Sequence, residues 1–283
     1  MSKIVLLDAY NMIHRCRFNW GGGKADGEYT IIYNFMKLIK ATAEFHYADE
    51  IYFVLDGRPK KRVESFPQYK ANRKKELIDP EEIAYWESFR RQKREVINIV
   101  KNYLPINVVY HPDNEADDLI YHICKHKASP EDVIHIISSD SDYIQIINEF
   151  DNVTLYNPVA KKERVRTEYD YVSWKAMVGD RSDNIPGVPR IGKVTAGKIL
   201  KNGTLNERLK DPKFRENYEI SYSLIKLMDL KEIEDEIEMT KSAFKIEDLK
   251  SVFLDMEFKS LLEEEYLNSF TEVFEHLENN HEG

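Results

Sequence analysis

Three short apolar runs, each followed by aspartate, constrain the fold of this chain more than any other feature. They cover residues 4–7, 51–55 and 133–137, and they are followed by Asp8, Asp56 and, after two serines, Asp140 and Asp142. Runs this short and this rich in β-branched residues are typical of buried parallel strands rather than helices. In an open α/β sheet the ligand crevice lies beyond the carboxyl ends of the strands. The sequence therefore predicts an α/β fold with a mainly parallel sheet and an acidic site shared by several strand ends.

Length and composition are those of a globular protein. The chain has 283 residues, of which 42% are hydrophobic, enough for one large or two modest domains. No segment approaches the roughly 20 apolar residues of a membrane helix, and no signal-peptide pattern precedes the first strand. We expect a cytoplasmic protein without membrane contact. The two cysteines, Cys16 and Cys124, lack CxxC or zinc-finger spacing, so we assign them no function.

The charge distribution is strongly polarised along the chain. The net charge is −9, but residues 229–283 alone hold 17 acids and 5 lysines, which leaves the preceding residues at +3. Between residues 58 and 101 there are 13 Lys or Arg against 7 Asp or Glu. This basic segment is the candidate phosphate-binding surface.

Further patterns predict the elements between and after these strands. A helical period over 29–47 indicates a crossover helix of a right-handed βαβ unit. We also expect a helix over 80–103, a strand over 106–110, a hairpin-like segment over 152–166 and a helix over 169–178. The arginines of segment 9–20 fit either a solvated connection or a phosphate contact, and both interpretations stay open.

Basic and aromatic residues alternate between residues 57 and 75. Cations neutralise phosphates and rings stack on unpaired bases, so this mixture suits a nucleic-acid substrate. The helix over 80–103 adds a cluster of Arg90, Arg91, Lys93 and Arg94 midway along its length. Charge runs are also common on solvated faces, so the pattern alone fits both a nucleic-acid-binding surface and a solvated surface.

An acidic group opens the helix expected after residue 114. Asn114 is the expected N-cap, and acids in a first helical turn are favoured by the helix dipole, which is ordinary helix-start chemistry. Three acids in four residues, Glu115, Asp117 and Asp118, exceed that need. Glu115 and Asp118 share a helix face, so metal binding is the second interpretation.

Residues 179–200 combine carboxylates with a glycine-bracketed turn. Asp180 and Asp183 are spaced i, i+3, and Gly187 and Gly192 bracket a tight turn before a helix running to residue 200. We expect the turn amides and the helix N-terminus to face outward, with Lys193 and Lys198 nearby, as a grip for a phosphate backbone. A helix-turn-helix corner that merely packs is the alternative.

Six motifs in this order resemble the flap endonuclease (5′ nuclease) family. They are Asp8; Asp56; Tyr69-Lys70 with Arg73; Glu115-Ala116-Asp117-Asp118; residues 138–142; and residues 179–188. The family includes the 5′-nuclease domain of bacterial DNA polymerase I and the phage enzymes called ribonuclease H. The match spans residues 4 to about 230, and segment 223–230 and the long basic insertion are most similar to the phage type. No polymerase module follows, and the acidic C-terminal region has no counterpart in the polymerases.

The resemblance implies a PIN-like fold in three parts. These are a catalytic domain over 1–178 with a helical arch at about 59–105, a helix-hairpin-helix region over 179–228 and an acidic helical region over 229–283. A single-stranded 5′ end is expected to pass through the arch while the hairpin grips the duplex. A K⁺ ion at the hairpin and a monomeric state are further implications.

Nine clustered carboxylates imply bound cations, because like charges in one crevice disfavour each other's ionised forms. Oxygen-rich ligation selects Mg²⁺ or Mn²⁺. By resemblance, one ion is surrounded by Asp8, Asp56, Glu115, Asp117, Asp118 and Asp140, and the other by Asp142, Asp180 and Asp183. Lys70 and Arg73 would stabilise the scissile phosphate and Tyr69 would stack on the terminal base. Further expected nucleic-acid contacts are Lys74, Arg90, Arg94, Gly187, Gly192, Lys193 and Lys198.

The implied function is structure-specific 5′ nuclease activity, both exonuclease and flap endonuclease, by a two-metal mechanism. Expected substrates are flapped, nicked or gapped duplexes containing RNA or DNA, with primer removal in replication as the role. Expected partners are these junctions and a replication protein such as a single-stranded-DNA-binding protein or clamp. If the chain is phage-encoded, its location is the host cytoplasm.

Two other classes of protein share parts of this pattern. A non-catalytic DNA-binding protein on this scaffold would have lost carboxylates, whereas all nine are present. A small PIN-type ribonuclease would lack the hairpin at 187–196 and the long basic insertion. For residues 229–283, a helical cap over the core is favoured over a partner-binding tail, because apolar residues recur there at helical spacing.

Overall fold

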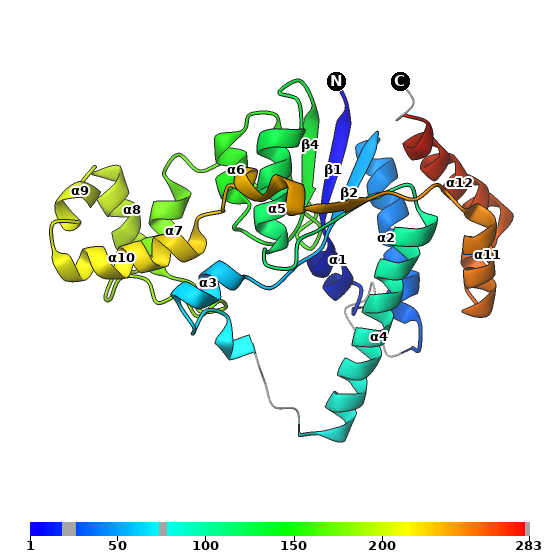
Figure 1. Ribbon diagram of the computed structural model, residues 1–283, viewed down its shortest axis with the longest axis horizontal. Coiled ribbons are helices and arrows are strands. Elements are labelled where there is room, and N and C mark those ends of the chain that lie inside the picture. The colour runs from blue at the N-terminus through cyan, green and yellow to red at the C-terminus, as the bar shows by residue number, and fades with distance from the viewer. Residues whose placement is uncertain (19–26, 74–77, 281–283) are drawn as a thin grey trace.

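A computed structural model describes residues 1–18, 27–73 and 78–280. Its centre is a seven-stranded sheet with the order β6-β5-β4-β1-β2-β3-β7 (Figure 1). The strands are β1 (Lys3–Asp8), β2 (Glu50–Val54), β3 (Asn107–Tyr110), β4 (Val133–Ile137), β5 (Val153–Asn157), β6 (Lys162–Glu163) and β7 (Glu238–Thr240). The five inner strands run parallel, while β6 and β7 are antiparallel edges. The predicted mainly parallel α/β sheet is confirmed.

Strand β1 lies at the centre of the sheet, and four of its six side chains, those of residues 4–7, are apolar and buried. Leu7 is in register with Phe53 of β2 on one side and with Ile137 of β4 on the other. In chain order, β2 and β3 follow β1 and lie on one side of it, and the later strands β4 and β5 lie on the other side. The strand order therefore reverses between β1 and β4, and the crevice at such a switch point is the usual ligand site.

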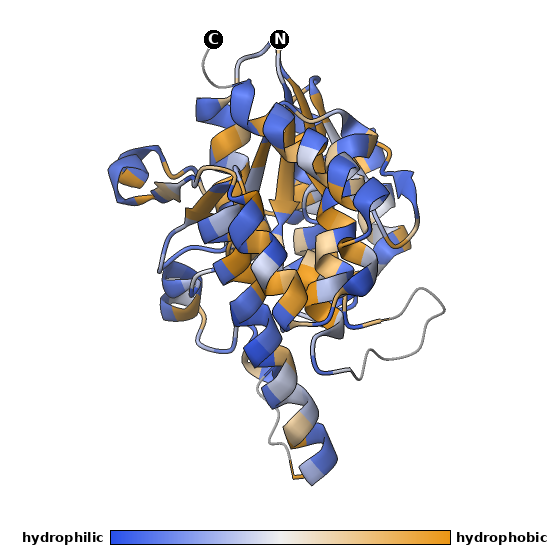
Figure 2. Ribbon diagram, turned by 90° about the vertical axis from the view of Figure 1, so that its right-hand side faces the viewer, coloured by the Kyte–Doolittle hydropathy of each residue, from blue (hydrophilic) through white to orange (hydrophobic). Residues whose placement is uncertain are grey.

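Helices cover both faces of the sheet (Figure 1). The helices of the described residues are α1 (Ala9–Arg15), α2 (Thr30–His46), α3 (Lys60–Ser65), η1 (Ala71–Arg73), α4 (Pro80–Tyr103), α5 (Ala116–His122), η2 (Ile123–Lys127), α6 (Ile144–Glu149), α7 (Tyr171–Val178), α8 (Lys193–Lys201), α9 (Leu205–Arg208), α10 (Pro212–Ile225), η3 (Lys231–Glu236), α11 (Ile246–Asp255), η4 (Lys259–Leu261) and α12 (Glu264–Asn279). One apolar core joins the sheet to α1, α2, α4, α11 and α12, and a second joins it to α5 and α6. A third core holds α7, α8 and α10 together. Figure 2 shows mainly hydrophobic strands enclosed by helices that carry both hydrophilic and hydrophobic residues.

Helix α4 projects beyond the layered body (Figures 1 and 2). It begins where the Asp79 side chain accepts the Glu81 N–H at 3.0 Å, with Pro80 at the first helical position. Together with α3 and η1, it makes up the described part of the predicted arch. The predicted helices over 29–47, 80–103 and 169–178 and the hairpin-like segment over 152–166 are all present.

The C-terminal region packs on the core as a cap. Phe253 of α11 and Phe270 and Phe274 of α12 are fully buried in the same core cluster as α2. The sequence did not predict β7, which pairs with β3 and makes residues 238–240 part of the central sheet. The acidic region is therefore joined to the sheet by hydrogen bonds as well as by its helices. No helix among the described residues is long and apolar enough to cross a membrane.

Candidate active site

Four carboxylates gather at the switch point of the sheet. Asp8 ends β1, Asp56 follows β2, Asp140 follows β4, and Asp117 lies in the first turn of α5. We call these four residues the strand-end cluster. The negative charges of Asp56 and Asp140 act on Asp8, and Asp117 is subject to those of Asp8, Asp56 and Asp140. The predicted meeting of three strand-terminal aspartates is thus present.

Hydrogen bonds fix two of these side chains. Asp8 Oδ1 accepts the Asn11 N–H at 3.1 Å, and its Oδ2 accepts the hydroxyls of Ser138 at 2.9 Å and Tyr143 at 3.3 Å. Asp56 Oδ1 accepts the Ala116 N–H at 2.9 Å, one of the unpaired amides that open α5.

Asp56, rather than Asn114, supplies the side-chain cap of α5. The expectation that Asn114 caps this helix is wrong, because its amide nitrogen lies 2.8 Å from His111 Nδ1 and Glu115 occupies the N-cap position. A carboxylate from a different strand therefore holds the start of α5. This contact places Glu115 and Asp117 beside the end of β2.

The strand-end cluster carries more negative charge than the protein neutralises. Burial and then the neighbouring Asp56 raise the pKa of Asp8 to about 7, and burial raises the pKa values of Asp56 and Asp117 as well. Among the described residues, none of the four forms an ion pair with Lys or Arg. A hard divalent cation bound by oxygen atoms fits this donor set.

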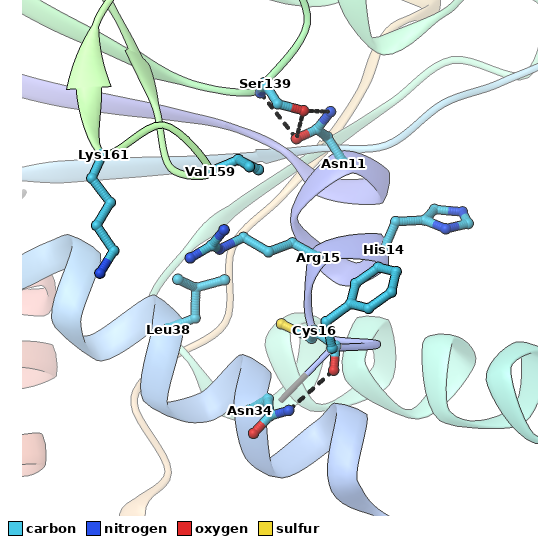
Figure 3. A pocket seen from close by; sticks show the side chains of 10 residues that line it. Asn11, His14, Arg15, Cys16, Asn34, Leu38, Ser139, Val159 and Lys161 are labelled. Atoms are coloured by element: carbon cyan, nitrogen blue, oxygen red, sulfur yellow. Dashed lines mark hydrogen bonds between the residues drawn. The ribbon is translucent and has the colours of Figure 1, made fainter. Parts of the chain in front are cut away.

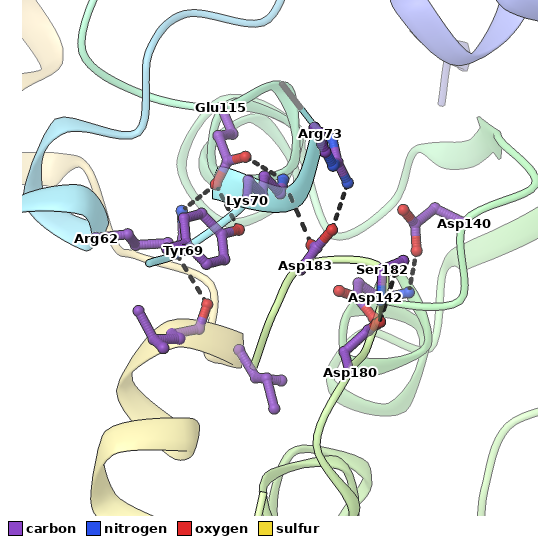
Figure 4. Close-up of polar contacts among 12 residues, drawn as sticks. Arg62, Tyr69, Lys70, Arg73, Glu115, Asp140, Asp142, Asp180, Ser182 and Asp183 are labelled. Atoms are coloured by element: carbon purple, nitrogen blue, oxygen red, sulfur yellow. Dashed lines mark hydrogen bonds and ion pairs between the residues drawn. The ribbon is translucent and has the colours of Figure 1, made fainter. Parts of the chain in front are cut away.

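Glu115 is held beside this cluster by three side chains of segment 58–73 (Figure 4). Its Oε1 is paired with Lys70, and its Oε2 accepts from Arg62 Nη1 at 2.9 Å and from the Tyr69 hydroxyl at 3.0 Å. Because Glu115 is 5% exposed, these contacts stabilise a charge that water hardly reaches.

Asp118 serves a different purpose from the one predicted. Arg62 binds both of its oxygens, with Nη1 to Oδ2 at 2.6 Å and Nη2 to Oδ1 at 2.8 Å, and the Met228 N–H donates to Oδ1 at 2.9 Å. Asp118 and Arg62 are both buried. The prediction that Asp118 is a metal ligand is therefore wrong. Arg62, although part of the basic segment, faces the interior rather than a phosphate.

Tyr69 is buried rather than available for stacking. Only 6% of the residue is exposed, its hydroxyl donates to Glu115, and its ring belongs to the core of α7, α8 and α10. The expectation that it stacks on a terminal base is wrong. Sequence alone did not show this because the burial of Tyr69 depends on a long-range contact.

That contact is the docking of segment 66–73 on the loop after α7. The Lys70 N–H donates to the Asp183 carbonyl at 2.9 Å, Asn184 Nδ2 donates to the Gln68 carbonyl at 2.7 Å, and Asn72 Nδ2 to that of Arg181 at 2.9 Å. Lys70 is in the left-handed region with φ of 55°, so the chain turns sharply there. The predicted contact Lys74 lies outside the described residues.

The remaining carboxylates already have cationic partners in the protein, and Figure 4 shows those of Asp183. Asp183 pairs with Arg73 and, at 3.5 Å, with Lys70. Asp142 and Asp180 both pair with Lys175 of α7, the latter at 2.8 Å. We call Asp142, Asp180 and Asp183 the paired group.

Lys175 is a site residue that the sequence did not reveal. Burial raises the pKa of Asp142 to about 6, whereas at Asp180 hydrogen bonds from Lys175 and Ser182 outweigh burial and lower the pKa to about 2. The available signal was a lysine on a helix that is otherwise mostly apolar. Such a residue is buried only when it is paired.

Most of the predicted nucleic-acid contacts are exposed in the structure, but one is buried. Gly192, Lys193 and Lys198 are exposed at the start of α8 and along it, as are Arg90 and Arg94 on α4. Gly187 is different, because it is buried and its N–H donates to Ser221 Oγ at 3.0 Å. The expectation that the Gly187 amide faces outward is therefore wrong.

A pocket of about 570 Å³ lies between α1, α2 and the loops that carry Ser139 and Lys161 (Figure 3). Asn11 Nδ2 donates to Ser139 Oγ at 2.9 Å across one wall, which ties α1 to the loop that carries Asp140. Arg15 and Lys161 add positive charge to the lining. The lining of this pocket therefore combines positive charge with polar and apolar side chains.

Comparisons with known proteins agree with this geometry. The family described as "5′-3′ exonuclease, N-terminal resolvase-like domain" matches residues 3–176. A 5′-3′ exonuclease of Aquifex aeolicus is 28% identical over 93% of this chain and 95% of its own length. A thermostable DNA polymerase I of Thermus thermophilus is 31% identical over 74% of this chain, which corresponds to only 25% of the polymerase.

Solved structures show the same fold. The T5 D15 protein co-crystallised with metal ions has a TM-score of 0.67, with 22% identity over 81% of this chain and 89% of that chain. A complex of a substituted T5 D15 flap endonuclease with DNA and metal ions has a TM-score of 0.68, with 19% identity over 98% and 100% of the two chains. The sheet is thus that of the PIN-like T5 enzymes, and the chain belongs to the 5′-3′ exonuclease family.

Proposed function

We propose that this protein is a metal-dependent, structure-specific 5′ nuclease that hydrolyses phosphodiesters near the 5′ end of nicked, gapped or flapped duplexes. The observation that carries the proposal is the strand-end cluster, four carboxylates without an ion-pair partner among the described residues, beside Lys70 and Arg73. Anionic ligands for cations next to protein cations are what phosphodiester hydrolysis requires. Membership of the 5′-3′ exonuclease family supports the same reaction.

The residues present fit two divalent ions. Asp8, Asp56, Asp117 and Asp140, with Glu115 at their edge, would hold one, and Asp142, Asp180 and Asp183 the other. When bound, such ions supply an activated water and stabilise the leaving oxygen. We propose Mg²⁺, with Mn²⁺ as a substitute, because all the ligands are carboxylates. Related T5 structures are described as containing metal ions, zinc in one case, which supports divalent binding.

The chain's own cations would position the substrate. Lys70 and Arg73 are paired with Glu115 and Asp183 at the edge of the acidic site. Both side chains are long enough to turn from these carboxylates to a phosphate oxygen. Arg73 is the more accessible, with 56% of its side chain exposed. The strand-end cluster itself would repel the phosphodiester, so this neutralisation is needed for binding as well as for hydrolysis.

Substrate selection would depend on geometry rather than on base sequence. The projecting α4 presents Arg90 and Arg94 one helical turn apart, so both can follow the backbone of a single-stranded 5′ end. The start of α8, with Gly192 and Lys193, would hold the duplex through its phosphates, with K⁺ as an additional ligand there. A T5 flap endonuclease variant of the same fold is described as a complex with DNA, which supports DNA as a ligand of this protein.

We further propose a role in removing RNA primers during DNA replication, with RNA or DNA 5′ ends as substrates. The protein would act as a monomer in the cytoplasm, where its substrates form. A single-stranded-DNA-binding protein or clamp is the expected partner.

The testing experiment uses 5′-labelled flapped, nicked, gapped and blunt duplexes, each with an RNA or a DNA 5′ end. Short 5′ products from the flapped, nicked and gapped substrates, formed with Mg²⁺ but not with EDTA, are the expected result. The ratio of flap to nick cleavage gives the balance of activities. Tight binding of every junction without cleavage in Mg²⁺ or Mn²⁺ would instead indicate a non-catalytic DNA-binding scaffold.

A further inference from the structure

Two histidines and an aspartate meet at the end of α5 opposite the strand-end cluster. His122 ends α5, His126 lies in the following π-helical turn η2, and Asp229 belongs to the segment after α10. One ligand atom of each residue lies within 4.8 Å of the other two. His126 Nε2 is already 2.7 Å from Asp229 Oδ1.

His122 is the unusual member of this group. The residue is 1% exposed, and neither ring nitrogen has a hydrogen-bond partner among the described residues. An unpaired buried donor or acceptor is energetically unfavourable. A bound ion would satisfy a nitrogen that the protein leaves unpaired.

The backbone turns both rings to one side. Residues four apart share a helix face, and here the rings lie with centroids 5.1 Å apart. The Ala128 N–H donates to the Ile123 carbonyl at 3.0 Å, the wider turn of a π-helix, which is frequent at functional sites.

Asp229 is brought there by the contacts of its neighbour. The Met228 N–H is bound to Asp118, so the chain is fixed one residue before the ligand. Tetrahedral ligands at the usual zinc distances lie about 3.3 Å apart, so closure requires only small side-chain rotations. Asp229, with 41% of its side chain exposed, has the freedom to make them.

We propose that His122, His126 and Asp229 bind a first-row transition-metal ion such as Zn²⁺, with water completing a tetrahedral shell. Imidazole nitrogens favour such ions over Mg²⁺, which distinguishes this site from the all-carboxylate active site. Asp117 and His122 lie five residues apart on α5, roughly 8 Å along its axis. The ion would fasten the start of the C-terminal region to α5 and stabilise the fold.

Lys125 should weaken metal binding at this site. Its Nζ lies 2.8 Å from Asp229 Oδ2, so the ammonium competes with an ion for the same carboxylate. Removing this charge while keeping the side-chain length, as in Lys125→Met, should therefore tighten metal binding. A merely structural role for the histidines would not produce that increase.

The test titrates the full-length protein with Co²⁺ in saturating Mg²⁺, which fills the carboxylate site, and follows the visible absorption of tetrahedral cobalt. We expect one Co²⁺ per chain, displaced by Zn²⁺, with a thermal stabilisation of the protein. His126→Gln and Asp229→Asn should weaken binding at least about tenfold. Lys125→Met should strengthen it several-fold.

Matched controls separate this site from others. His276 also faces an aspartate, Asp49 at 3.4 Å, but the described residues place no second histidine there. His276→Gln and the active-site variant Asp140→Asn should therefore leave the cobalt spectrum unchanged. Absence of a tetrahedral spectrum, or equal affinity in folded His126→Gln, overturns the proposal, and so does weaker binding in Lys125→Met.

Discussion

Arg62 and Asp118 form a buried bidentate ion pair, with nitrogen to oxygen distances of 2.6 and 2.8 Å. Arg62 also donates to the carbonyls of Leu224 at 2.9 Å and Lys226 at 3.2 Å. One side chain thus joins α3 to α5 and to the end of α10. Two neighbouring aspartates therefore have different roles. Asp117 belongs to the strand-end cluster, whereas Asp118 pairs with Arg62 in the interior.

Asp118→Asn is expected to destabilise the protein, whereas Asp117→Asn is not. Removing one partner of a buried pair costs roughly 3–5 kcal/mol, because the charge of Arg62 loses its bidentate partner and keeps only Glu115. Asp117→Asn removes repulsion within the strand-end cluster and should keep or raise the metal-free stability while weakening Mg²⁺ binding. Urea unfolding in EDTA and calorimetric Mg²⁺ titration measure both effects, and equal unfolding free energies for the two variants would refute this division.

The metal-free protein should lose stability as the pH rises through the acidic range. The pKa of Asp8 is raised from 3.8 to about 7, so between these values the folded chain holds a proton that the unfolded chain has lost. Unfolding free energy therefore falls with increasing pH, at up to about 1.4 kcal/mol per unit for this group.

Mg²⁺ should reverse this trend, because the ion binds the ionised carboxylates and releases their protons. Urea unfolding at about pH 5 and about pH 7, in EDTA and in Mg²⁺, tests the sign. Asp8→Asn should flatten the EDTA profile. A metal-free stability that rises across this range in wild type would contradict the raised pKa.

Lys175→Met is expected to tighten divalent binding at the paired group. The ammonium neutralises both Asp142 and Asp180, so it competes with an ion for them. Losing one such partner should raise affinity by about tenfold, equivalent to one pKa unit of interaction. A Mn²⁺ titration monitored by electron paramagnetic resonance measures this affinity, with Lys175→Arg as the charge-conserving control. Weaker binding in Lys175→Met would show that the lysine positions the carboxylates instead.

Lys193→Ala and Lys198→Ala should each weaken junction binding and reduce its salt dependence. A lysine that contacts one phosphate contributes about one unit to the slope of log affinity against log salt. Lys250→Ala on α11 is the matched control, since that lysine pairs with Glu247 within the acidic region. Binding titrations in EDTA over a range of salt provide the slopes. An unchanged slope in both variants would remove α8 from the interface.

The C-terminal cap should be required for stability. Phe274 is fully buried against the core, so Phe274→Ala should cost roughly 3–5 kcal/mol, whereas Leu254→Ala, at a site 64% exposed, should have little effect. Deleting residues 263–283 should lead to aggregation. A truncated protein that stays folded and active but loses stimulation by a replication protein would indicate a docking tail.

The strand-end cluster could be predicted from the sequence because it depends on short local patterns, each an apolar run followed by an acid. Short β-branched runs form parallel strands, and the residues after them meet at one edge of the sheet. The actual roles of Arg62 and Tyr69 could not be predicted, because each is buried only once segment 58–73 docks on distant parts of the chain. Strand β7 was missed for a related reason, since all three of its residues are exposed and only pairing with β3 defines it.

The most direct test of the account compares wild type with Asp140→Asn on a 5′-labelled flap. Asp140 belongs to the strand-end cluster, and its substitution removes one of the four negative charges without changing the side-chain size. We expect wild type to release short 5′ products with Mg²⁺ and none with EDTA. Asp140→Asn should bind the flap with similar affinity in EDTA, bind Mg²⁺ more weakly and cut at least about a hundredfold more slowly. Cleavage by Asp140→Asn at the wild-type rate would contradict the assignment of the strand-end cluster as the catalytic metal site.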